Sequence, residues 1–122
     1  MIQSGKTNNN FTKKEKDRYR PLIYHGAISR AMAEDMLGQQ GDGSYLIRDC
    51  ETSASCLVLS VRSGLSFLHL KIRRRGGRFV LGGDTAGFQA ISGLVRHYSQ
   101  HWLRIRGGRA VRLKHPARER IL

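Results

Sequence analysis

The chain has 122 residues, of which 39% are hydrophobic and 7% aromatic, so composition predicts one domain with a modest core. Lysine and arginine total 22 against 9 acidic residues, and the resulting net charge of +13 favours anionic partners. No stretch approaches the roughly 20 apolar residues of a membrane span, and the N-terminus lacks the apolar segment of a secretory signal peptide.

Cysteine and histidine usage exclude further classes of protein. Cys50 and Cys56 are the only cysteines, too few and too close in sequence to suggest a disulfide framework, so we expect passive free thiols in a reducing compartment. The five histidines show no zinc-like spacing with them. We therefore expect neither a metal nor a cofactor.

The two ends of the chain differ from its middle. Residues 1–20 are polar and basic, which predicts a flexible leader, and residues 117–122 form a short tail around a single domain at 21–116. The chain enters the domain through 21–26. Ser29 is a predicted N-cap for a helix over 30–37 that Gly38 ends, with Ala33, Met36 and Leu37 on its core side.

An arginine lies within an apolar segment at 43–49. Side chains alternate along a strand, so Leu46 and Arg48 share one face while the other face is also apolar, as in a covered central strand. Arginine keeps its charge on burial and needs an anionic partner. That partner is either internal, for instance Asp49 or Glu51, or a phosphate held with the help of the polar, donor-rich loop at 49–55.

The remaining segments predict a short antiparallel meander followed by a helix. Strands fit 56–62, 67–73 and 79–81, with hairpin signals at 63–64 and 75–78. A second helix fits 88–100, where apolar residues recur at helical spacing. A loop at 103–109 precedes a last strand at 111–113. The order predicts an α+β fold with a central antiparallel sheet flanked by two helices, and no internal repeat is present.

Five segments together resemble a Src homology 2 domain, the phosphotyrosine-binding module. Tyr-His-Gly-Ala-Ile-Ser-Arg at 24–30 resembles the opening of that family, and Gly-Asp-Gly-Ser-Tyr-Leu-Ile-Arg-Asp at 41–49 resembles its signature strand. The segments 57–62 and 68–72 are similar to its next two strands, and 94–99 to its second helix. The resemblance extends over residues 22–116, in the order and spacing of the family.

The resemblance implies a phosphotyrosine site. Arg48 forms the floor and pairs with the phosphate through two bonds, while Arg30 approaches phosphate and ring from the first helix. Thr52 and Ser53 belong to a loop that closes over the phosphate. His69 forms a wall of the implied pocket, and Lys71 flanks the ring. The alternatives are that Arg30 and Lys71 are solvated surface charges and that His69 is a strand histidine without a ligand role.

Two positions depart from the family pattern. Cys50 stands where the family usually has a serine that donates to the phosphate, and a thiol is a weaker donor. Leu70 stands where many members carry an aromatic residue. With Leu81 it forms an implied specificity groove for apolar residues downstream of the phosphotyrosine, flanked by 82–87 and 103–109.

The predicted function is binding of tyrosine-phosphorylated proteins by a non-catalytic, monomeric adaptor or effector module. We expect no enzyme activity, because no nucleophile–base pair or nucleotide loop is apparent, and we place the protein in the cytoplasm, or in the host cytosol for a microbial effector. The alternative is a basic polyanion-binding domain. Nucleic acid is the weaker form of it, because no aromatic array accompanies the basic run at 71–75. Acidic membrane lipid is an additional partner that can coexist with peptide binding.

Overall fold

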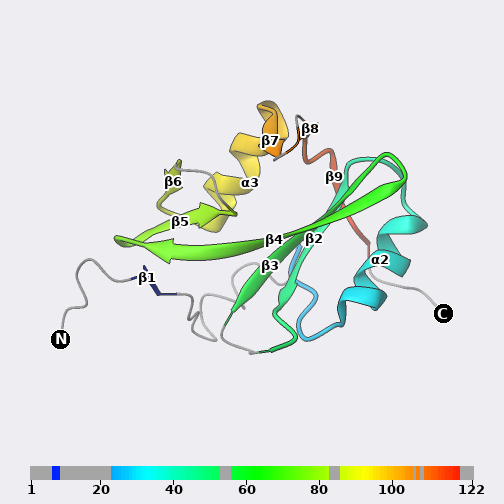
Figure 1. Cartoon of the computed structure of the whole chain (residues 1–122), viewed down its shortest axis with the longest axis horizontal. Coiled ribbons are helices and arrows are strands. Elements are labelled where there is room, and N and C mark those ends of the chain that lie inside the picture. The colour runs from blue at the N-terminus through cyan, green and yellow to red at the C-terminus, as the bar shows by residue number, and fades with distance from the viewer. Residues whose placement is uncertain are drawn as a thin grey trace.

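The computed structural model describes residues 7–8, 23–52, 56–82, 86–105, 107 and 109–118. Within these residues a seven-stranded sheet lies between two helices, α2 (Arg30–Gly38) and α3 (Ile91–Gln100) (Figure 1). The two helices cover opposite faces of the sheet because its strands are apolar on both faces. The predicted α+β architecture is confirmed.

The sheet is mostly antiparallel. Its spatial order is β6 (Gly87–Phe88), β5 (Arg78–Leu81), β4 (Ser66–Arg75), β3 (Leu57–Ser63), β2 (Ser44–Asp49) and β9 (His115–Pro116). Only β9 runs parallel to its neighbour, β2. β1 (Thr7–Asn8) pairs with the end of β4. A separate hairpin is formed by β7 (Leu103–Ile105) and β8 (Arg109–Val111).

Alternation along β2 divides the core into two clusters. Tyr45 and Ile47 join the larger cluster, which packs against α3. Leu46 packs on the other face with Ala33 and Leu37 of α2. Arg48 follows Leu46 at period two and therefore lies on the α2 face of the sheet. The two predicted faces of this strand are confirmed.

Local signals at 29–38 produce α2 as expected. The Ser29 hydroxyl accepts a hydrogen bond from the Met32 amide at 3.0 Å, and the helix ends at Gly38. The Glu51 carboxylate accepts a second bond, from the Arg30 amide at 2.6 Å. Two of the otherwise unpaired amides at the start of the helix therefore have acceptors. The acceptor of the Arg30 amide, Glu51, comes from the loop after β2.

The structure corrects several short segments. The second helix begins at Ile91, because residues 87–88 pair with β5 as a strand. The predicted loop at 103–109 contains β7 and the first residue of β8, and in this hairpin Leu103 lies opposite Val111 with both side chains buried. The last predicted strand at 111–113 is displaced to Arg109–Val111, and β9 was not expected. Residues 7–8 form β1 within the predicted leader; the rest of the leader lies outside the described residues.

The C-terminal segment is fastened to the turn before β2. Gly43 has a φ of +84°, and a Cβ there would lie 2.5 Å from the Lys114 side chain, so glycine is required for this close approach. The Lys114 amide donates to the Gly43 carbonyl at 2.9 Å, and its ammonium lies 2.9 Å from the Asp42 carboxylate. Ala117, which falls in the predicted tail, is buried against α2.

Candidate functional site

Arg48 is a buried arginine with unused donors. Its side chain, 4% exposed, lies at the end of β2 on the α2 face. Nε donates to the Ser60 hydroxyl at 3.1 Å, Nη1 to the Asp49 carbonyl at 3.2 Å and Nη2 to His69 Nδ1 at 3.3 Å. A guanidinium has five N–H groups, so with three used, one remains on each terminal nitrogen. This pair of N–H groups matches two oxygens of a phosphate.

The two carboxylates that could neutralise Arg48 are engaged elsewhere. Asp49 accepts a bond from the Tyr24 hydroxyl at 2.8 Å, and Glu51 accepts from the Arg30 amide. Among the described residues, neither forms an ion pair with Arg48. Burial lowers the pKa of Arg48, and the charge of Glu51 only partly offsets this. A buried cation with uncompensated charge favours an anionic ligand.

A hydrogen-bond chain joins Arg48 to α2. The Ser60 hydroxyl, which accepts from Arg48, donates to His69 Nδ1 at 2.8 Å, and His69 Nε2 donates to the Glu34 carboxylate at 2.7 Å. Arg48 can only donate, so Nδ1 at 3.3 Å from Nη2 is assigned as an acceptor, which puts the proton of a neutral imidazole on Nε2. The chain therefore fixes both the His69 tautomer and the position of the guanidinium.

The pKa directions agree with this assignment. Burial lowers the pKa of His69, and the bond to Glu34 offsets only part of the effect. The pKa of Glu34 is lowered, chiefly by the hydrogen bond from His69. The lowered pKa of Glu34 alone would suit an ion pair with imidazolium, but the donors around Nδ1 favour neutral His69. At neutral pH we therefore assign an uncharged imidazole beside an ionised carboxylate.

The other predicted residues lie at different distances from Arg48. The Arg30 side chain is exposed, and its Nε lies 3.5 Å from the Glu34 carboxylate one turn along α2. Lys71 is exposed on β4, opposite Val58, which is itself opposite Arg48. Lys71 is thus two strands, roughly 10 Å, from Arg48 on the same face. Thr52 is exposed, and Ser53 lies outside the described residues.

Sequence reasoning missed two residues of this arrangement, Ser60 and Glu34, and gave a third, Glu51, a different partner. Ser60 is the buried link between Arg48 and His69, and its signal was a lone hydroxyl on the second face of an apolar strand. Glu34 lies four residues after Arg30, a spacing that places both on one helix face. Glu51 was considered as a partner of Arg48, but its carboxylate caps the helix that carries Arg30.

The expectation of free thiols is wrong in this structure. Cys50 and Cys56 form a disulfide with a Cα–Cα distance of 5.2 Å, and the Cys50 amide donates to the Cys56 carbonyl at 2.8 Å. Closeness in sequence does not prevent the bridge, because antiparallel pairing of β2 and β3 brings the two ends of the loop together. The Cys50 sulfur consequently has no S–H to donate.

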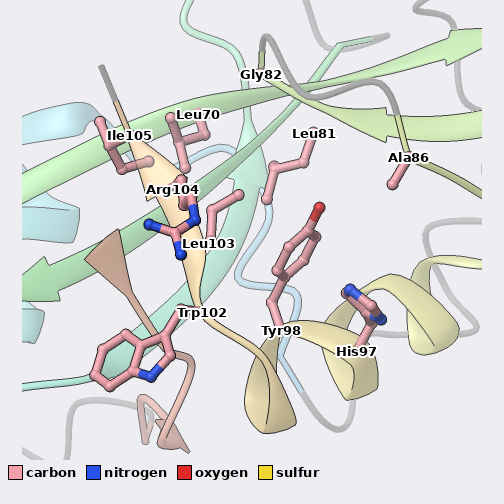
Figure 2. A pocket seen from close by; sticks show the side chains of 10 residues that line it. All are labelled: Leu70, Leu81, Gly82, Ala86, His97, Tyr98, Trp102, Leu103, Arg104 and Ile105. Atoms are coloured by element: carbon pink, nitrogen blue, oxygen red, sulfur yellow. The ribbon is translucent and has the colours of Figure 1, made fainter. Parts of the chain in front are cut away.

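A second feature lies on the opposite face of the sheet from Arg48. It is a cavity of about 760 Å³, to which β4, β5, α3 and residues 102–105 contribute side chains (Figure 2). Its apolar lining includes both predicted groove residues, Leu70 and Leu81, with Tyr98 and Leu103. Arg104 and His97 add polar groups to the lining.

Comparison with known proteins identifies the fold. The sequence profile described as "SH2 domain" matches residues 23–98, more than half of the chain. The chain belongs to the SH2 domain family. The SH2 domain is similar to SH2 domain-containing adapter protein B of Homo sapiens (35% identity; 83% of this chain, 20% of the relative). It is also similar to adapter protein D of Mus musculus (42%; 76% and 27%) and to tyrosine-protein phosphatase corkscrew of Drosophila melanogaster (37%; 76% and 11%).

Family membership carries the general function. An SH2 domain is a phosphotyrosine-peptide-binding module without catalysis of its own, and the polyanion-binding alternative is not favoured. The chain spans about a fifth to a quarter of the two adapter proteins. In the described residues, no helix combines the length and apolarity of a membrane span, and no group of three His, Cys, Asp or Glu side chains is placed to hold a metal.

Proposed function

We propose that this SH2 domain binds phosphotyrosine through Arg48, in a pocket whose wall is His69 and whose mouth is flanked by Arg30 and Lys71. The observation that carries the proposal is the buried guanidinium, which keeps one free N–H on each terminal nitrogen and has no carboxylate partner among the described residues. A phosphotyrosine adds about −1.5 to −2 charges at neutral pH and supplies the missing anion. Thr52 and Ser53 complete the loop side of the proposed pocket.

The sheet suggests a path for the ligand. β5 pairs only with the second half of β4, Ile72 to Arg75, so the described residues leave the edge of β4 at 66–70 open on that side. A peptide crossing this edge places its phosphotyrosine on the α2 face. Its downstream residues then reach the cavity on the α3 face, where Leu70 and Leu81 favour an apolar side chain.

The family also suggests a cellular setting. We propose a monomeric, cytoplasmic adaptor or effector without enzyme activity, whose partners are tyrosine-phosphorylated proteins, with acidic membrane lipid as an additional partner. Glutathione and thioredoxin keep cytosolic thiols reduced, so Cys50 and Cys56 would be a dithiol there. Alkylation of intact cells followed by mass spectrometry reports which form is present.

A binding experiment tests the pocket directly. Calorimetry at physiological salt would compare degenerate phosphotyrosine, phosphoserine and unphosphorylated peptide pools, for the native chain and for Arg48→Ala. We expect binding of the phosphotyrosine pool alone, lost in the variant. Equal binding of phosphoserine, or undiminished binding by the variant, would contradict the pocket and favour general polyanion binding.

A further inference from the structure

Four basic residues form a continuous surface beside the proposed pocket, which we name the basic ridge: Lys71, Arg73, Arg75 and Arg78. The first three alternate along β4 and so share one face, the face that carries His69. Arg78 joins them because it lies directly opposite Arg75 across the β4–β5 hairpin. Lys71, Arg75 and Arg78 are exposed, and Arg73 is half-buried with Nη2 donating to the Gly82 carbonyl at 2.6 Å.

The ridge contains an unfavourable contact. Arg75 and Arg78 occupy directly opposed positions, where like charges destabilise an antiparallel pair. No carboxylate of the described residues forms an ion pair with any of the four ridge side chains. Within the described part of the chain this charge therefore has no carboxylate partner, and an external anion would relieve the repulsion.

The ridge begins at the phosphotyrosine site. Lys71 belongs to the row that crosses three strands from Arg48 through Val58. From Lys71 the ridge runs along β4 to Arg75, about 14 Å at roughly 3.4 Å per residue. An extended ligand segment of about four residues would cover that length.

The path proposed for the ligand determines which segment can reach the ridge. Residues after the phosphotyrosine cross the edge of β4 to the cavity on the α3 face. Residues before it remain on the α2 face, where the nearby helix carries the acidic residues Glu34 and Asp35. That helix also carries Arg30, so its charge is mixed, whereas the ridge is wholly basic and attracts an acidic ligand segment.

We propose that the basic ridge binds acidic residues in the ligand segment that precedes the phosphotyrosine. This inference rests on the proposed function, because the anchored phosphate is what holds the segment beside the ridge at high effective concentration. The ridge would select among phosphotyrosine ligands rather than replace the pocket, and its contribution would decrease with salt, as for other exposed charges.

Two matched peptides test the proposal. They would be identical from the phosphotyrosine onward and carry either four glutamates or four glutamines before it. For the native chain at physiological salt we expect the glutamate peptide to bind about fivefold more tightly, the size expected of a few exposed ion pairs. In Arg75→Gln/Arg78→Gln we expect the preference to fall to about twofold, because Lys71 and Arg73 remain, with the affinity for the glutamine peptide unchanged.

A control pair separates the ridge from net charge. Arg96→Gln/Arg109→Gln removes the same charge from exposed positions on α3 and β8, and we expect it to keep the fivefold preference. Loss of the preference in this control would overturn the ridge in favour of overall charge. Equal binding of both peptides by the native chain would refute the ridge alone, whereas binding of neither would refute the proposed function.

The same variants also test whether the ridge binds an anionic membrane surface instead of a ligand segment. Vesicles containing anionic phospholipid would be offered to the native chain and to Arg75→Gln/Arg78→Gln in the absence of peptide. Vesicle binding that depends on these arginines, without a peptide preference, would replace the proposed ligand segment with a lipid surface and overturn the inference.

Discussion

Arg48→Lys separates the charge of the proposed phosphate site from its geometry. The lysine keeps a positive charge at the end of β2 but cannot present two parallel N–H groups. Each charge-assisted hydrogen bond to a phosphate contributes about 1.5–3 kcal/mol. Loss of one of the two bonds therefore predicts affinity for a phosphotyrosine peptide that is about 10- to 150-fold lower. Lysine also cannot satisfy Ser60, Asp49 and His69 together, which adds to the loss.

Calorimetry with one phosphotyrosine peptide measures this loss, and thermal unfolding confirms that the variant is folded. Arg62→Lys is the matched control. Arg62 lies on β3, on the same face of the sheet as Arg48, but it donates to the Gly64 and Gly38 carbonyls, each at 2.9 Å, rather than toward Arg48. We expect its peptide affinity to be native. An Arg48→Lys variant that binds within threefold of the native chain would refute a two-bond contact and indicate that a positive charge alone is sufficient.

Three further predictions concern the surroundings of the site. Glu34→Gln should raise phosphotyrosine affinity about two- to fivefold in fluorescence anisotropy, because a negative charge at the pocket is removed; weaker binding would mean that the carboxylate is needed to orient His69. Because burial lowers the folded-state pKa of His69, the unfolded chain takes up a proton first as pH falls through about 6.5. Urea titrations should therefore show a lower free energy of unfolding at pH 5.5 than at pH 7.5, with a smaller difference in His69→Gln. Cys50→Ser should lower the free energy of unfolding of the oxidised protein by about 2 kcal/mol, the value for closing so short a loop, and an unchanged value would argue that the bridge does not form.

The sheet and its central arginine could be predicted because they depend on local patterns. Period-two alternation placed Leu46 and Arg48 on one face, and Ser29 marked the start of α2. The β7–β8 hairpin could not be recognised, because its Leu103 and Val111 are isolated among arginines and glycines and become buried only when the hairpin joins the core cluster beside α3. Short strands of this kind are defined by tertiary contacts rather than by their own sequence.

The candidate site was likewise predictable only in part. Arg48, Arg30, His69 and Lys71 were predicted as site residues through motif spacing, and these four residues lie on one side of the sheet. Ser60 and Glu34 link three of them, and apart from the Arg30–Glu34 pair within α2 these links join different elements, such as Glu34 of α2 and His69 of β4. Hydrogen-bond partners of that kind follow from packing of α2 on the sheet, which no single segment encodes.

The contact between Lys114 and Gly43 shows that residues beyond the family match belong to the folded domain. The family match ends at residue 98, but the cavity wall, the edge strand β9 and the amide of Arg118, which donates to the Gln40 side chain at 2.7 Å, all come later. A chain cut directly after α3 would therefore have an open sheet edge beside β2 and would lack four of the ten residues that line the cavity, Trp102, Leu103, Arg104 and Ile105. We therefore expect a graft that retains the proposed groove to need residues through Arg118, beyond those that the family profile matches.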